Sequence, residues 1–217
     1  MAANFWETAW AERRIGFHQP EVNADLVSEA GWFLDDKPHR VLVPLCGKTV
    51  DMAWMAARGH EVVGVELTEQ GAHEFFADRG LTPTASSVGA FTALRAGAIT
   101  ILRGDIFDLH TADEAPFDRI WDRAAMIALP PDLRPRYQAQ MADLVGAGAT
   151  MLLNVLEYDP TRMTGPPFSV PAAEVEAAFA GLPVTLLARA DQMDDRWRER
   201  GHSWMTRHLY RVGAAGR

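Results

Sequence analysis

The sequence predicts an α/β fold with a mostly parallel sheet. From residue 41 onward, short apolar runs alternate with segments of helical periodicity, an order that produces right-handed crossovers between parallel strands. The chain has 217 residues, 48% of them hydrophobic and 23% charged, which suits one α/β domain with a substantial core. We therefore expect a single domain over residues 1–217, with seven strands and helices on both faces of the sheet.

Seven apolar segments predict the strands. They are residues 41–46, 61–67, 99–107, 117–123, 149–156, 184–189 and 206–212. Four segments between them have helical periodicity and are closely followed by glycine, the residue that most often ends a helix. They are residues 50–58, 69–79, 131–145 and 171–179. A polar link without helical periodicity joins the last two strands, so we expect them to form a C-terminal antiparallel hairpin.

Residues 1–40 precede the first strand and begin with three large rings, those of Phe5, Trp6 and Trp10. Rings of this size must be buried somewhere. The helical spacing of Trp6 and Trp10 favours a helix packed on the flank of the sheet. A lid that covers a ligand would bury the rings equally well, and the sequence leaves both arrangements open.

The ends of the first two strands predict a nucleoside site. The first strand ends in Pro44-Leu45-Cys46-Gly47-Lys48, and the second ends at Glu66, which is placed to accept hydrogen bonds from ribose hydroxyls. The turn lacks the glycines that a dinucleotide or a triphosphate requires, which disfavours NAD, FAD and ATP. S-adenosylmethionine fits this pattern, with its methionine group at the backbone near Leu45 and Gly47. The alternative is that Glu66 is only a solvated acid at a strand end.

Composition excludes several other classes of function. A net charge of −8 would repel a nucleic-acid backbone. The single cysteine, Cys46, rules out an intramolecular disulfide and is expected to be a packing residue. The histidines lack metal-ligand spacing, and no G-x-S-x-G hydrolase motif is present. Residues 1–17 contain no apolar signal core, so we expect a cytoplasmic monomer that acts on small molecules, without a nucleic-acid or membrane partner.

Several motifs occur together at the spacing of one enzyme family. They include Phe5-Trp6-Glu7, Gly16-Phe17-His18-Gln19, Pro44-Leu45-Cys46-Gly47-Lys48, Trp121-Asp122-Arg123 and Gly165-Pro166-Pro167-Phe168. With them the chain resembles the thiopurine S-methyltransferase family, in particular its bacterial members, nearly from end to end. The resemblance implies a class I S-adenosylmethionine-dependent methyltransferase with a Rossmann-like sheet and an N-terminal helical lid. It further implies methyl transfer to the sulfur of thiopurines or other aromatic or heterocyclic thiols, with S-adenosylhomocysteine as product.

The resemblance also implies roles for individual residues. Arg123 would act in catalysis, and Phe17 and Arg200 would contact the acceptor. The expected cofactor contacts are Trp10, Leu45, Gly47, Glu66, Asp105, Ile106 and Arg123. No metal is expected.

The reaction would be a direct displacement in which a guanidinium favours the acceptor thiolate. The sequence names no general base, although Asp122 could act through a water. Arg200 is one of three arginines at alternate positions, so the acceptor contact could fall on a neighbour. Two other functions stay open: methylation of a selenium or tellurium compound or a small natural thiol, and binding of S-adenosylmethionine without catalysis.

Overall fold

The computed structural model describes residues 3–110 and 115–214, with side chains from Phe5 onward. The chain divides into two compact units, Met1–Trp121 and Asp122–Arg217. In the part of the chain that the structure describes, no helix is both long and apolar enough to cross a membrane. The expectation of one domain over residues 1–217 stays a prediction.

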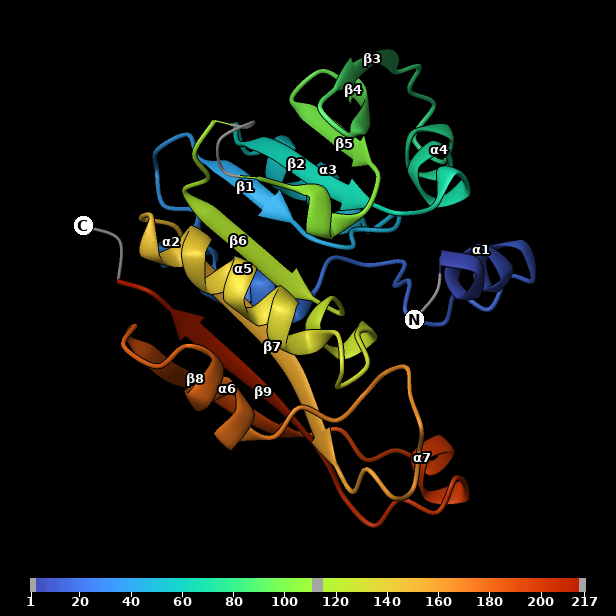
Figure 1. Ribbon diagram of the computed structural model, residues 1–217, viewed down its shortest axis with the longest axis vertical. Helices are drawn as coiled ribbons and strands as arrows, with labels where there is room; N and C mark the ends of the chain where they lie inside the picture. The colour runs from blue at the N-terminus through green and yellow to red at the C-terminus, as the bar shows by residue number, and fades with distance from the viewer. Residues whose placement is uncertain (1–2, 111–114, 215–217) are drawn as a thin grey trace. The chain divides into compact units, whose positions relative to one another are not determined.

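The first unit is built on parallel strands. Strands β1 (Arg40–Val43), β2 (Glu61–Glu66), β5 (Ile99–Arg103) and β6 (Arg119–Arg123) lie in the order β5-β2-β1-β6, and β6 enters the second unit with its last two residues. Each neighbouring pair is parallel, and the arrows of β1, β2 and β6 in Figure 1 run the same way. The carboxyl ends of β1, β2 and β5 therefore share one edge of the sheet.

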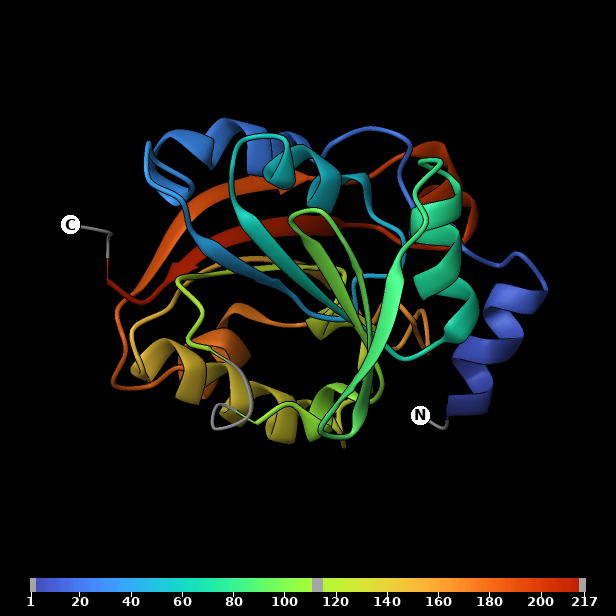
Figure 2. The same ribbon diagram turned by 90° about the horizontal axis from the view of Figure 1, so that it is seen from above.

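The helices of the first unit begin at side-chain caps. Asn23, Thr49 and Thr68 accept hydrogen bonds from the backbone at the start of α2 (Ala24–Phe33), α3 (Val50–Ala56) and α4 (Glu69–Ala77). Helices α3 and α4 pack against β2 and β5. Helix α1 (Ala3–Ala11) lies beside α4, as both Figure 1 and Figure 2 show.

The second unit is antiparallel. Its strands β7 (Thr150–Tyr158), β9 (Met205–Val212) and β8 (Val184–Asp191) are neighbours in that order. Its helices are α5 (Arg134–Gly146), α6 (Ala172–Ala178) and α7 (Asp195–Glu199). The hairpin expected at the C-terminus is confirmed, because β8 and β9 pair antiparallel.

All seven expected strands and all four expected helices are present, with shifted ends, and four elements were not anticipated. Strands β3 (Thr84–Val88) and β4 (Phe91–Ala96) add an antiparallel hairpin to the first sheet, so the described residues contain nine strands rather than seven. Strand β3 is exposed and rich in small polar residues, and therefore lacks an apolar signal. Helix α2 was also missed, and so was α7, which replaces the expected irregular link and begins at the Asp194 cap.

Candidate functional site

The turn after β1 has a backbone that few residues adopt. Leu45 and Gly47 both lie in the left-handed region, with φ of 47° and 51°. Cys46 ties the turn to β2, since its N–H donates to the Val65 carbonyl at 2.9 Å. Glycine suits the third position because a Cβ there would be strained and would lie 3.4 Å from the Trp10 ring.

Glu66 joins this turn to the end of β2. One carboxylate oxygen accepts a hydrogen bond from the Gly47 N–H at 2.9 Å, and the other accepts from the Thr68 N–H at 2.8 Å and the Thr68 hydroxyl at 2.5 Å. The residue is only 6% exposed, and no cation within the described ranges pairs with it. Burial therefore raises the pKa of the Glu66 carboxyl, even though these hydrogen bonds act to lower it.

The hydrogen bonds of Glu66 limit what it can still bind. A carboxylate has about four acceptor positions, and three are used here. One position is left, on the oxygen that faces Gly47. The group fits one ribose hydroxyl of an adenosine cofactor, where the sequence predicted two.

The third strand of the site is β5. Its last residue, Arg103, pairs with Glu66, and the Gly104 N–H donates to the Glu66 carbonyl at 2.9 Å. Asp105 and Ile106 follow at the same edge. The exposed Asp105 caps a short 3-10 helix (Ile106–Asp108) by accepting from the Phe107 N–H at 3.0 Å, whereas Ile106 is 5% exposed. The structure thus brings a polar and an apolar side chain to the edge that also holds Glu66.

Trp10 reaches the same edge from α1. The residue is 2% exposed, and its ring packs over both Gly47 and Gly71. A Cβ added at Gly71 would lie 2.9 Å from the ring. Phe17 stands edge-on to Trp10, with ring centroids 5.9 Å apart. Helix α1 thus packs on α4, and Trp10 packs on the turn of the predicted cofactor site. Whether the segment is a packed helix or a lid stays a prediction.

Cys46 is a packing residue, as expected. The residue is buried and its sulfur lies close under Gly64, where a Cβ would approach it to 2.5 Å. Burial raises the pKa of the thiol well above its ordinary value, so the sulfur stays protonated.

In the second unit, Asp122 is held by hydrogen bonds from the protein. The residue is fully buried, and its carboxylate accepts from the Tyr137 hydroxyl at 2.7 Å and from the Met126 N–H at 3.1 Å. Burial raises its pKa to about 6. Both oxygens of this buried carboxylate accept hydrogen bonds from the protein, which argues against its acting through a water; the sequence named no general base. Asp122 instead fixes the turn after Arg123, where Ala124 has a φ of 64°.

The three arginines of the predicted acceptor segment differ in their partners. Arg196 and Arg198 pair with aspartates at 3.6 and 2.8 Å. Arg200 caps the end of α7, and its guanidinium lies over the Trp197 ring at 5.1 Å. It has no ion pair to any residue that the structure describes. The charge of Arg200 is therefore the least neutralised of the three.

Comparison with known proteins agrees with this geometry. Residues 1–214 match the family described as thiopurine S-methyltransferase (TPMT). The chain belongs to the thiopurine S-methyltransferase family. It is 43% identical over 213 residues to a thiopurine S-methyltransferase of Pseudomonas paraeruginosa, covering 97% of this chain and 98% of the relative. It is 40% identical over 215 residues to one of Azotobacter vinelandii, covering 98% and 99%. As a member of this family, the protein is an S-adenosylmethionine-dependent methyltransferase.

Solved structures of other methyltransferases share the fold. Magnesium protoporphyrin IX methyltransferase of Synechocystis, crystallised with S-adenosylhomocysteine, has a TM-score of 0.64 at 13% identity and covers 98% of this chain and 97% of its own. The 1,6-didemethyltoxoflavin-N1-methyltransferase of Burkholderia thailandensis has a TM-score of 0.63 at 18% identity, covering 98% and 87%. The class I methyltransferase fold expected from the sequence is thereby confirmed.

Two residues that support the site in this family member were not singled out from the sequence. Thr68 binds Glu66 and caps α4, and its place directly before a predicted helix is a recognisable cap signal. Tyr137 holds Asp122 but lies 15 residues away in the chain, inside an ordinary helix. No local pattern would have found it. Among the described residues, no cluster of His, Cys, Asp and Glu could hold a metal ion.

Proposed function

We propose that this enzyme transfers the methyl group of S-adenosylmethionine to the sulfur of a thiopurine or of another aromatic or heterocyclic thiol. The observation that carries the proposal is the 43% identity over 213 residues to a protein named thiopurine S-methyltransferase. The match spans nearly all of both chains, and the family motifs around Gly47 and Arg123 are intact.

The edge formed by β1, β2 and β5 supports the cofactor assignment. In this proposal, the backbone of Leu45 and Gly47 holds the methionine part and Glu66 accepts a ribose hydroxyl. Ile106 covers the adenine while Asp105 or its backbone reads the adenine edge. Trp10, already packed on the Gly47 turn, closes the same side. When bound, S-adenosylmethionine supplies a methyl group on a positively charged sulfur and leaves as S-adenosylhomocysteine.

We further propose that Arg123 is the catalytic residue, contacting both cofactor and acceptor, and that Phe17 and Arg200 line the acceptor site. An aromatic thiol is acidic enough that the protein must favour its anion rather than supply a strong base. A guanidinium does this at close range where water is excluded. The burial of Asp122 fits a mechanism that needs no base from this motif. Arg200 has no ion pair among the described residues, which favours Arg200 over Arg196 and Arg198 as the acceptor contact.

We also propose a single-domain, monomeric, cytoplasmic enzyme whose partners are small molecules. The net charge of −8 supports the exclusion of nucleic acids.

The first test compares kcat/KM for 6-mercaptopurine, small natural thiols, and selenium and tellurium compounds. A thiopurine-type acceptor predicts the highest value for the aromatic thiol. A higher value for a selenium or tellurium compound would contradict the proposed acceptor class, and no turnover of any of them would contradict the proposed reaction.

The second test is Arg123→Lys, which keeps the charge but loses the planar fork. Because a misplacement of about 1 Å can cost on the order of a hundredfold in rate, we expect kcat/KM for 6-mercaptopurine to fall by about that factor. The melting temperature should stay unchanged. Arg95→Lys, on the exposed side of β4, is the matched control and should leave turnover intact. Near wild-type turnover in Arg123→Lys would remove this residue from the mechanism.

A further inference from the structure

We propose that Glu74 is a positioning residue that holds the N-terminal helix and the Gly47 turn together. Its carboxylate, the guanidinium of Arg13 and the ammonium of Lys48 form a cluster that we call the Glu74 clasp. None of the three is among the predicted ligand contacts. The inference rests on the proposed cofactor edge, because Trp10 and Gly47 are the groups that the clasp would position.

The contacts of the clasp come from three separate segments of the first unit. Arg13 reaches both carboxylate oxygens of Glu74, at 2.7 and 2.8 Å. Lys48 donates to Glu74 at 2.9 Å and lies 2.9 Å from Asp78 on the same helix end. Gln70 adds a hydrogen bond at 2.7 Å. One carboxylate on α4 thus binds a cation that follows α1 and a cation that follows Gly47.

The clasp is better placed than an ordinary surface ion pair. Exposed pairs contribute little because water and salt screen them. Here the side chains of Glu74 and Lys48 are only 18% and 11% exposed, although that of Arg13 is 63% exposed. One Arg13 nitrogen contacts both oxygens of Glu74. Although burial acts in the opposite direction, hydrogen bonds from Gln70, Lys48 and Arg13 lower the pKa of Glu74 to about 2. The carboxylate is therefore ionised at every pH at which the enzyme would be assayed.

The backbone of Arg13 is a second observation that concerns the clasp. Its φ is 57°, in the left-handed region that a long side chain rarely adopts. Its N–H donates to the Trp10 carbonyl at 3.1 Å, so the strained turn begins directly after Trp10. Such a conformation persists where the surrounding contacts over-determine it, and the ion pair with Glu74 is one such contact.

The ring of Trp10 lies where the clasp can position it. The ring packs over Gly47 and Gly71. Lys48 directly follows Gly47, Arg13 comes three residues after Trp10, and Glu74 comes three residues after Gly71. The clasp and the ring therefore connect the same three segments. Loss of the clasp would free α1 to move and would lower the fraction of molecules in which Trp10 and Gly47 are set for the cofactor.

The main experiment uses Glu74→Gln, with Glu12→Gln as the matched control. Glu12 forms an equally short pair with Arg14, at 2.7 Å, on the same N-terminal segment, but the Glu12 side chain is 58% exposed whereas that of Glu74 is 18% exposed. We expect the Kd for S-adenosylhomocysteine to rise by about tenfold in Glu74→Gln and to stay unchanged in Glu12→Gln. The KM for S-adenosylmethionine should rise while kcat stays near its wild-type value, a split that a general loss of folded protein would not produce.

A second variant keeps the inference testable if Glu74→Gln is poorly folded. Arg13→Gly removes the ion pair but relieves the left-handed backbone, so its melting temperature should not fall. If the clasp positions Trp10, this variant still binds S-adenosylhomocysteine about tenfold more weakly. Wild-type affinity in Arg13→Gly, or in a folded Glu74→Gln, would overturn the inference.

Glu66→Gln separates this inference from the proposed cofactor site. If Glu66→Gln binds S-adenosylhomocysteine as the wild type does, the proposed site fails and the clasp has nothing to position. If Glu66→Gln binds weakly while both clasp variants bind normally, the cofactor site stands and only the clasp is wrong.

Discussion

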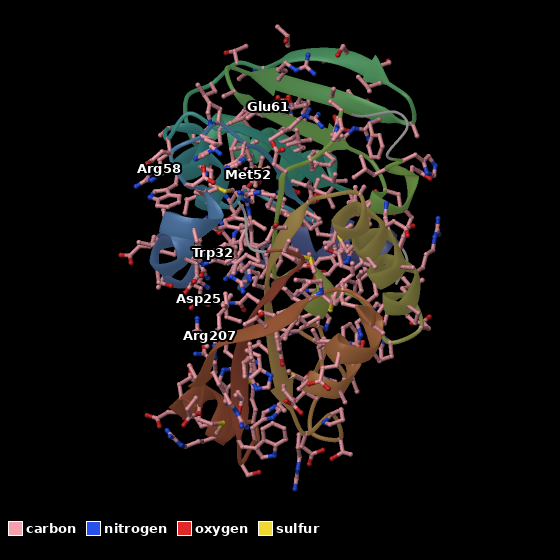
Figure 3. All side chains as sticks on the ribbon, turned by 90° about the vertical axis from the view of Figure 1, so that its left-hand side faces the viewer. Asp25, Trp32, Met52, Arg58, Glu61 and Arg207 are labelled. Carbon is pink, nitrogen blue, oxygen red and sulfur yellow. The ribbon has the colours of Figure 1, made fainter. Side chains whose placement is uncertain are left out.

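The two ends of the parallel strands in the first unit surround an acid with different kinds of partner: Glu66 is buried, whereas the side chain of Asp35 is 29% exposed. At the carboxyl ends, Glu66 is held by the neutral donors of Gly47 and Thr68. At the amino ends, which Figure 3 shows with Arg58 and Glu61 labelled, Asp35 lies 3.0 Å from the His39 ring and 3.4 Å from Arg119. The pKa of the Glu66 carboxyl is raised by burial. The pKa of the Asp35 carboxyl is lowered, first by the Lys37 N–H and then by His39 and Arg119.

The difference supports our proposal that Glu66 binds a ligand, whereas Asp35 completes a structural contact. Arg119 donates to the Phe33 carbonyl as well as pairing with Asp35, so it joins β6 to the end of α2. At this end the carboxylate of Asp35 and the guanidinium of Arg119 compensate each other's charge, and together they hold β6 against the end of α2. Glu66 carries a buried charge without a compensating cation among the described residues, and it keeps one acceptor position. A cofactor with a hydroxyl to donate would use that position.

The largest effect should come from Glu66→Gln. The amide removes the negative charge and replaces one acceptor by a donor that opposes the Gly47 N–H. We expect the affinity for S-adenosylhomocysteine to fall by about 1.5–3 kcal/mol, the range for hydrogen bonds to a charged group. Glu61→Gln, at the exposed start of the same strand, is the control and should bind normally. Unchanged affinity in Glu66→Gln would make Glu66 a structural acid like Asp35, and the comparison would fail.

Asp35→Asn should show the opposite pattern. It leaves the mostly buried Arg119 without its carboxylate partner, so we expect the free energy of unfolding to fall by about 1–3 kcal/mol. The affinity for S-adenosylhomocysteine should not change, because this end of the strands is distant from the proposed site. Denaturant unfolding and calorimetry on the same variant measure both quantities. A loss of affinity without a loss of stability would contradict the assignment.

Tyr137→Phe tests another buried acid, Asp122, which like Glu66 is held by neutral donors. Removing the hydroxyl leaves a buried carboxylate with fewer partners, so we expect a loss of about 1–2 kcal/mol in stability. If Asp122 fixes the turn that carries Arg123, kcat should also fall while the KM for S-adenosylmethionine stays the same. A fall in stability with unchanged kcat would limit this pair to a structural role.

The smallest effect is a difference in pH dependence. An acid whose pKa is higher in the folded state stabilises the fold at low pH, and that contribution is lost as pH rises through its folded-state pKa, about 6 for Asp122. The lowered pKa of Asp35 acts the other way, since its contribution is lost only as pH falls below the ordinary value for aspartate. As the pH rises from 4.5 to 7.5, the wild type should therefore lose stability relative to Asp122→Asn. Thermal melts of both proteins across this range would measure the difference. A constant difference across that range would mean that the Asp122 pKa is not raised.

Much of the fold follows from local patterns. The strands at the centre of the first unit are buried on both faces and appear as continuous apolar runs, and the helices between them end near glycine. The same signals fail where an element is exposed or short. Strand β3 forms because β4 pairs with it, and helix α7 because Asp194 caps it, and neither cause is visible as an apolar pattern.

The sequence by itself determined which residues stand at the carboxyl ends of the strands, because a strand ends where its apolar run ends. Leu45, Gly47 and Glu66 could therefore be placed at one edge without a structure. Asp105 and Ile106 were implied only by the family resemblance, because the expected strand ran through them to residue 107, whereas β5 ends at Arg103. Their partners were decided only in three dimensions. Lys48 meets Glu74 across 26 residues and Arg13 meets it across 61. Asp122 is taken out of contact with water by a tyrosine on another element. Such contacts depend on how helices and strands pack, and a linear pattern carries no record of that packing.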